Sequence, residues 1–119
     1  MKLPLELEFR DTEPSPAVEA AIREHVSRLD EVFPQITRCR VVIECPHKHH
    51  HKGRIWHVHI NLTVPGQELA IDREPEQNHA HEDVYVALRD SFESARRALD
   101  GWARKRRGET RQSRRVALG

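Results

Sequence analysis

The fold of this chain is decided by residues 81–107, HEDVYVALRDSFESARRALDGWARKRR. Apolar side chains recur along this stretch at spacings of three and four residues, a period that predicts one α-helix with a continuous apolar stripe. The stripe consists of Tyr85, Leu88, Phe92, Ala95, Leu99 and Trp102. A stripe of this length has to be buried, so the rest of the chain must supply the surface that covers it.

The same stretch carries many cations, most of them off the apolar stripe. Arginine suits phosphate binding because its planar guanidinium pairs with phosphate oxygens and stacks on exposed bases. The candidate RNA-binding residues are Arg89, Arg96, Arg97, Arg104, Lys105, Arg106, Arg107 and Arg111. The alternative is a solvated face, in which Glu93 pairs with a neighbouring arginine and Asp100 with Arg104. Few acids offset the basic run at residues 104–107, which favours RNA binding.

Length and charge narrow the class of protein. The 119 residues, 37% apolar and 33% charged, suit one small domain. No apolar run approaches the ~20 residues of a membrane span, and the amino terminus has no signal-like segment, so we expect a cytoplasmic protein without a membrane partner. Residues 1–33 carry eight acids and four bases, whereas residues 82–119 carry six acids and ten bases. This gradient favours a cationic interface near the carboxyl terminus, although the net charge is only +1.

Hydrophobic patterns also predict the elements that cover the stripe. Ser15 and Pro16 are typical of a helix start, and Pro34 ends that helix. Its buried residues would be Val18, Ile22, Val26, Leu29 and Phe33. Alternating apolar and polar residues predict strands at residues 3–10, 38–45, 54–64 and 68–72, with a turn at Pro65 and Gly66.

The predicted order is β-α-β-β-β-α, an α+β fold in which two helices cover one face of a four-stranded, mostly antiparallel sheet. A helical connection allows the first two strands to be parallel, and the three later strands would form a meander. Residues 1–107 would form the domain. Residues 108–119 show no apolar period, which predicts a basic, flexible tail. The sheet edges leave self-association open.

Two cysteines, Cys39 and Cys45, fall on the second predicted strand. Six residues of strand separate them by ~20 Å, well beyond the ~7 Å between Cα atoms that a disulfide allows. We therefore expect two buried, reduced thiols that act as small apolar side chains.

Histidines form a second group of candidate functional residues. The candidates for metal binding are His47, His49, His50 and His51 in a loop, and His57 and His59 on the outward face of the third predicted strand. The group has no Cys-x-x-Cys or His-Glu-x-x-His spacing, so neither a metal site nor a cofactor is predicted. A polar loop that meets RNA is the simpler interpretation. Serines and glycines also show no catalytic or phosphate-binding motif, which argues against an enzyme with a small-molecule substrate.

Three segments resemble one known family. HEDVYVAL at residues 81–88, EAAIREHV at residues 19–26 followed by Leu29 and Phe33, and Arg97-Ala98-Leu99 are similar to segments of the ribosome hibernation-promoting factor and ribosome-associated inhibitor A family, also called sigma-54 modulation proteins. The resemblance covers roughly residues 3–107.

The resemblance implies a domain like that of double-stranded RNA binders and a non-enzymatic, cytoplasmic role in translation regulation under stress. Its partner would be the small ribosomal subunit and its rRNA, bound in the mRNA and tRNA channel. Arg97 and Lys105 stand at positions that look like family cations, whereas Ser94 and Gly101 replace frequent lysines. The chain resembles the short form, without the long form's C-terminal dimerisation domain. Inactivation of single ribosomes and assistance to ribosome pairing both remain open.

Two other classes of function stay as alternatives. The first is a histidine-rich metal-binding or sensing module with a basic surface. The second, with less support, is a hydrolase or nuclease that uses the histidines. Binding to ribosomes without metal would favour the RNA-binding interpretation over both.

Overall fold

The computed structural model describes residues 3–45, 56–72 and 83–118, with side chains described through residue 108. The elements follow the predicted order: β1 (Leu5–Arg10), α1 (Pro16–Val32), β2 (Arg38–Glu44), β3 (His57–Val64), β4 (Gln67–Asp72) and α2 (Val84–Leu118). The strand bounds differ by a few residues from the predicted ones, and residues 54 and 55 lie outside the described residues. The α+β class is confirmed.

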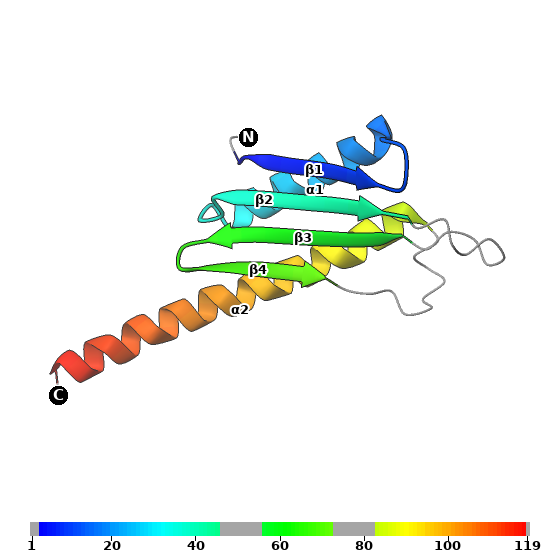
Figure 1. Cartoon of the computed structure of the whole chain (residues 1–119). Coiled ribbons are helices and arrows are strands. Elements are labelled where there is room, and N and C mark those ends of the chain that lie inside the picture. Colours follow the sequence, from blue (N-terminus) through cyan, green and yellow to red (C-terminus); the bar gives the residue numbers. More distant parts are fainter. Residues whose placement is uncertain (1–2, 46–55, 73–82, 119) are drawn as a thin grey trace.

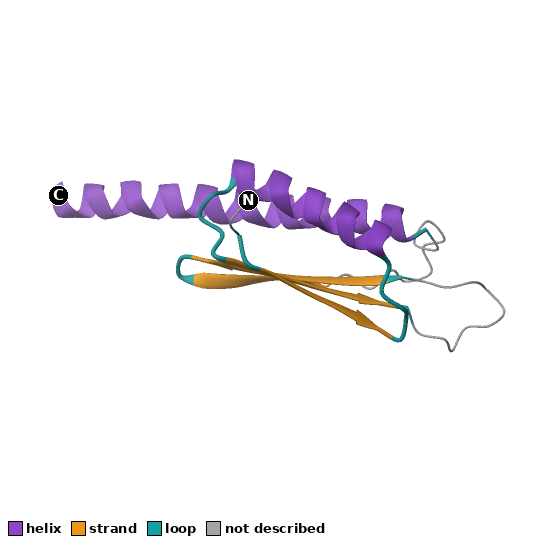
Figure 2. Cartoon of the chain, turned by 90° about the horizontal axis from the view of Figure 1, so that it is seen from above, coloured by secondary structure: helices purple, strands orange, loops and turns teal. Residues whose placement is uncertain are grey.

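The sheet has the strand order β1-β2-β3-β4 (Figure 1). β1 pairs in parallel with β2, and the other neighbours are antiparallel. Both helices lie on one face of this sheet, so the opposite face is left open (Figure 2). Pro65 and Gly66 form the turn between β3 and β4, where Gly66 has a φ of 85°, a conformation that glycine adopts without strain.

The first helix forms as its sequence predicts. The Ser15 hydroxyl accepts a hydrogen bond from the Val18 backbone N–H at 3.3 Å, and Pro16 occupies the first helical turn. All five residues of the predicted stripe are buried. On the solvent side, Arg23 and Arg28 form ion pairs with Glu19 and Glu24, each one helical turn away.

The core lies between the helices and the inward side chains of the strands. Fully or nearly fully buried residues include Cys39, Val41, Ile43, Val58, Ile60, Leu62, Leu88, Ala95 and Leu99. On the stripe of α2, Leu88, Phe92, Ala95, Leu99 and Trp102 are buried as predicted. The alternation of the strands and the helical period therefore converge on one core.

Tyr85 is a correction to the predicted stripe, because its side chain is 49% exposed. It lies in the first turn of α2, where no other described element covers it, and its backbone N–H donates to Asp83 Oδ1 at 2.8 Å. A phenol tolerates this position because its hydroxyl is polar. Ala87 and Ser91 are buried in its place.

The predicted end of the last helix is a second correction. We expected the helix to end at Arg107, but α2 continues to Leu118. No proline interrupts residues 101–118, and each of the two glycines, Gly101 and Gly108, costs only about 1 kcal/mol in a helix interior. The separation of a domain from a flexible tail at residue 108 stays a prediction.

Candidate nucleic-acid interface

The candidate RNA-binding residues lie along α2, which packs on β3 and β4 and then projects beyond the sheet (Figure 1). Seven of the eight have described side chains, and all seven are exposed: Arg89, Arg96, Arg97, Arg104, Lys105, Arg106 and Arg107. The side chain of Arg111 lies outside the described residues. By helical period, Arg97 and Arg104 share one face, and Arg89 and Arg96 share a neighbouring face.

Two of these arginines have acidic partners. Arg97 Nη2 lies 3.5 Å from Glu93 Oε1, and Arg89 Nη2 lies 3.3 Å from Asp90 Oδ1. Both pairs are exposed, so each contributes little to stability but does offset a cation. The solvated-face interpretation therefore holds for Arg89 and Arg97.

Four cations differ from these two. Within the described part of the chain, no acidic side chain forms an ion pair with Arg96, Arg104, Lys105 or Arg107, and we call these four residues the distal cations. The pairing of Asp100 with Arg104, which belongs to the solvated-face alternative, is not seen among the described side chains. The distal cations thus carry positive charge that a polyanion can neutralise.

Arg106 is positioned differently from its neighbours. Its guanidinium lies 5.5 Å from the centre of the Trp102 ring, and its Nη1 donates a hydrogen bond to the Pro65 carbonyl oxygen at 3.3 Å. A groove of about 130 Å³ runs between this part of α2 and the β3–β4 turn, and Gly66, Gln67 and Lys105 also line it. Arg106 therefore fastens α2 to the turn. The contact with Pro65 spans 41 positions, so the sequence does not reveal it, and RNA binding by Arg106 stays a prediction.

The surface of α1 has the opposite charge. Residues 16–32 carry four acids and two bases, whereas residues 84–108 carry three acids and seven bases. His25 of α1 stacks on Phe92 of α2, with ring centres 4.8 Å apart. Burial, with a smaller contribution from Arg28, lowers the pKa of His25. The contact between the helices therefore adds no cation at neutral pH. Of the two helices, as far as their side chains are described, α2 is the one with an excess of bases.

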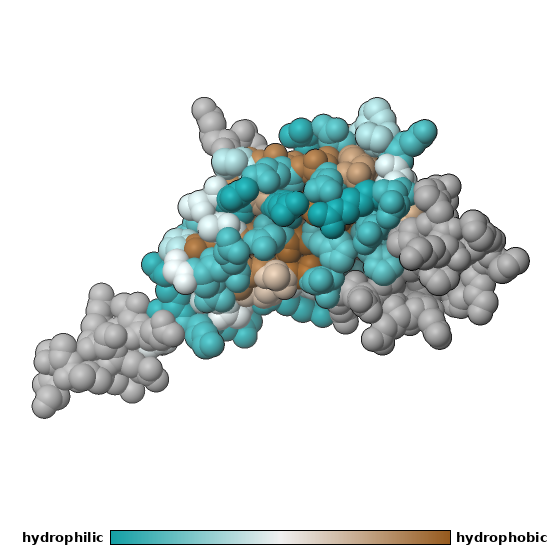
Figure 3. Space-filling view, viewed as in Figure 1, coloured by the Kyte–Doolittle hydropathy of each residue, from teal (hydrophilic) through white to brown (hydrophobic). Residues whose placement is uncertain are grey.

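The open face of the sheet carries charges that largely pair with one another. Arg38 forms an ion pair with Glu6, Arg40 with Glu8 at 3.2 Å, and Arg10 with Glu8 at 2.6 Å. The hydrogen bond from Arg10 lowers the pKa of Glu8. Figure 3 shows this face as mainly hydrophilic. Such a balanced surface is a poorer match for a polyanion than the distal cations are.

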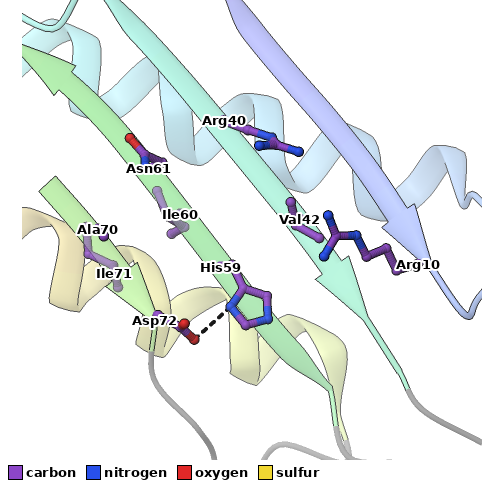
Figure 4. Close-up of a pocket in the computed structure, with 9 residues that line it drawn as sticks. All are labelled: Arg10, Arg40, Val42, His59, Ile60, Asn61, Ala70, Ile71 and Asp72. Carbon is purple, nitrogen blue, oxygen red and sulfur yellow. Dashed lines mark ion pairs between the residues drawn. The ribbon is translucent and has the colours of Figure 1, made fainter. Parts of the chain in front are cut away.

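A hollow of about 340 Å³ lies on this open face (Figure 4). Arg10, Arg40, Val42, His59 and Asp72 contribute to its lining. Val42 lines this hollow on the open face and is nevertheless buried.

The histidine candidates divide between described and undescribed parts of the chain. His57 and His59 lie on the outward face of β3, as predicted, beside Glu44 of β2. The loop candidates His47, His49, His50 and His51 lie outside the described residues. Sequence analysis did not find Glu44 as a neighbour of the histidines, although the alternation placed it outward.

The cysteines are unsuited to a reactive or ligand role. Cys39 and Cys45 are fully buried, as expected, and neither forms a disulfide. Burial raises the pKa of Cys39 to about 12, so its thiol stays protonated at neutral pH.

Among the described residues, no helix has the length and apolar character to cross a membrane.

Comparisons with known proteins agree with this architecture. A ribosomal subunit interface protein from Coxiella burnetii has a similar structure, with a TM-score of 0.69 and 14% identity over 85% of this chain and 98% of that chain. The N-terminal domain of Protein Y from Thermus thermophilus gives a TM-score of 0.63 and 16% identity over 86% of this chain and 99% of that chain. At these identities the likeness shows the fold. A comparison with curated protein sequences gave no match.

The family itself is shown by sequence, because a family model matches residues 5–107, which include all four strands, α1 and most of α2. The chain belongs to the sigma 54 modulation protein / S30EA ribosomal protein family.

Proposed function

We propose that this protein binds rRNA of the small ribosomal subunit through the distal cations of α2, occupies the mRNA and tRNA channel and thereby holds idle ribosomes inactive. Family membership supports the ribosome as the partner. One observation carries the rest of the proposal: the distal cations have no acidic partner among the described residues and lie on a helix that extends past the sheet (Figure 1).

The spacing of the distal cations suits a nucleic-acid backbone. From Arg96 to Arg107 the helix rises about 17 Å. Successive phosphates of one strand rise by ~3.4 Å along a B-DNA axis, and on that scale this length spans several phosphates. Each cation that meets a phosphate releases counterions, and binding should therefore weaken as salt increases.

The shape of the molecule also supports binding in a channel. The principal-axis extents are 64 × 30 × 17 Å, and the long axis follows α2 (Figure 1). The face of α2 that bears the distal cations can line a groove in the RNA while α1 stays outside it. The acidic surface of α1 would then face away from RNA, because like charges repel.

The test is co-sedimentation of the tag-free protein with small ribosomal subunits over a series of salt concentrations. The variant is the triple change Arg104→Gln, Lys105→Gln and Arg107→Gln. Loss of three phosphate contacts should lower affinity at every salt concentration and reduce the slope of log affinity against log salt by about 2 to 3.

A matched control removes three cations elsewhere: Arg23→Gln and Arg28→Gln on α1, and Arg38→Gln on the open sheet face. These arginines have acidic partners, so the control should bind subunits as the original chain does. Equal losses in the two triple variants would contradict the proposal, because net charge and not the α2 surface would then govern binding. Circular dichroism of each variant establishes that its fold is intact.

A further inference from the structure

Three side chains with metal-binding atoms converge on the open face of the sheet, opposite the helices. Glu44 of β2 pairs in register with His57 of β3, and His59 follows on the same face two residues later. Each residue offers one donor atom, and the three donor atoms lie within 4.8 Å of one another. The antiparallel register therefore brings two imidazoles and one carboxylate together.

One distance between donor atoms is close to that in a coordination sphere. Glu44 Oε1 lies 3.6 Å from His59 Nε2. Two donors at ~2.1 Å from a tetrahedral zinc ion are ~3.4 Å apart. The rings of His57 and His59 have centres 6.4 Å apart and planes inclined by 28°. Small side-chain rotations would bring the third donor into place.

Asp72 of β4 gives an independent indication of a ligand at this position. Its Oδ1 lies 2.7 Å from His59 Nδ1 (Figure 4). In the neutral tautomer in which Nδ1–H donates a hydrogen bond to this carboxylate, Nε2 is an acceptor that faces Glu44. Two acceptors then face each other, an arrangement that a bound cation stabilises. Histidines that ligate metals commonly donate their other N–H to a carboxylate in this way.

Burial and charge at the cluster also favour a cation. The side chains of Glu44 and His59 are 28% and 31% exposed, so an ion would be partly shielded yet reachable from solvent. Glu44 and Asp72 bring two negative charges to the cluster. The nearby cation Arg10 is held by Glu8 at 2.6 Å, which offsets its charge.

We propose that Glu44, His57 and His59 bind a divalent transition-metal ion of the zinc class, with Asp72 as the positioning residue of His59. Two imidazoles and a carboxylate suit Zn²⁺, Ni²⁺ or Cu²⁺ better than Mg²⁺ or Ca²⁺, which prefer oxygen donors. Three protein ligands leave a coordination position for water. The ion joins β2 to β3, and Asp72 links β4 to it. This site lies on the face of the sheet opposite α2 (Figure 2).

The experiment must separate this site from the histidines at positions 47, 49, 50 and 51. The starting protein is the full tag-free chain with all four changed to Gln. Titration calorimetry with Zn²⁺ and visible spectra with Co²⁺ are then recorded. The proposal expects one Zn²⁺ per chain and a Co²⁺ spectrum typical of a four- or five-coordinate site. Absence of binding in this starting protein would overturn the proposal.

Variants of the strand residues test which side chains hold the ion. In the same background, Glu44→Gln, and separately the double change His57→Ala and His59→Ala, should abolish Zn²⁺ binding. Asn61→Ala is the matched control, because Asn61 is the next outward residue of β3 and should leave affinity unchanged. Binding that persists in both ligand variants would overturn the site. If the double variant fails to fold, the near-isosteric Glu44→Gln decides the question.

The positioning role of Asp72 has its own readout. Asp72→Asn should weaken Zn²⁺ binding by ~10- to 100-fold, the range found for other partners of metal-bound histidines. The Co²⁺ spectrum of the loaded variant should keep the same band positions, because all three ligands remain. Unchanged affinity would overturn the role given to Asp72, and a different spectrum would mean that Asp72 is itself a ligand.

Discussion

The two helices cover the same face of the sheet, yet their solvent-facing surfaces differ in charge. Both bury apolar residues at helical spacing, Leu29 in α1 and Leu99 in α2 among them. Outside the core, residues 16–32 have an excess of two acids and residues 84–108 an excess of four bases. Two helices with similar buried apolar stripes can therefore carry solvent-facing surfaces of opposite net charge.

The pairing of charges sharpens this difference. The two arginines of α1 are held by Glu19 and Glu24 one turn earlier, whereas the distal cations of α2 have no such partner among the described residues. α1 also lies over the sheet along its length, whereas α2 projects past it (Figures 1 and 2). Exposure, lack of acidic partners and projection coincide on one helix, which is why the binding proposal rests on α2 alone.

The largest expected effects concern the buried apolar stripe, which both helices have. Leu99→Ala and Leu29→Ala should each lower the free energy of unfolding by about 2 to 5 kcal/mol, because each removes a buried side chain and leaves a cavity. Urea unfolding followed by circular dichroism measures both. Val32→Ala on α1 is the control, because Val32 is 59% exposed and should change stability little. A Leu99→Ala variant as stable as the control would break the equivalence of the two stripes.

A smaller effect divides the cations of α2 into structural and binding groups. Arg106→Ala should lower the free energy of unfolding by about 1 kcal/mol, through loss of the Trp102 contact and the hydrogen bond to Pro65. Arg107→Ala should change stability by less than about 0.5 kcal/mol. Subunit binding should show the reverse order, with the larger loss for Arg107→Ala. The same order in both measurements would contradict this division.

Local patterns predicted most of the fold. The Ser15 cap, the alternation in β2 and β3, and the spacing of Leu88, Phe92 and Leu99 all depend on neighbours in sequence, and each is confirmed. The predicted burial of Tyr85 was wrong, because an apolar stripe gives the direction of a side chain but does not show whether another element covers it. The predicted end of α2 was wrong, because a polar helical segment that packs on nothing has no apolar period from which its length can be predicted.

The candidate functional residues on α2 and on the open sheet face were less predictable, because their arrangement depends on contacts between residues that are distant in sequence. Sequence could place Arg106 on α2 but could not show its bond to Pro65. It could place Glu44 and His57 outward but not pair them, since the register across residues 46–56 is not encoded in either strand alone. The distinction between Arg97 and Arg104 likewise required the observed pairing with Glu93.

His25 tests the contact between the helices through pH. Its pKa in the folded chain lies below the ordinary value of 6.5, so the unfolded chain binds this proton more tightly. The free energy of unfolding is therefore unaffected by this group above pH 6.5, where His25 is neutral in both states. It falls as the pH drops from 6.5 towards the folded-state pKa, because the unfolded chain takes up the proton first. His25→Phe keeps a ring against Phe92 without a titrating group, so its stability should fall less on acidification. Parallel curves of unfolding free energy against pH for the two proteins would contradict this role.

The smallest expected effect increases the charge difference between the helices. Glu93→Gln removes the acidic partner of Arg97 and should release that arginine for a phosphate. Exposed pairs of this kind contribute about 0.2 to 1 kcal/mol, so affinity for small subunits should rise by about 1.4- to fivefold at low salt. Salt should reduce the gain, because it screens the charges involved. Glu24→Gln on α1 makes the same change beside Arg28 and should leave affinity as it was. Equal gains in the two variants would mean that RNA responds to net charge, and the contrast between α1 and α2 would then lose its functional meaning.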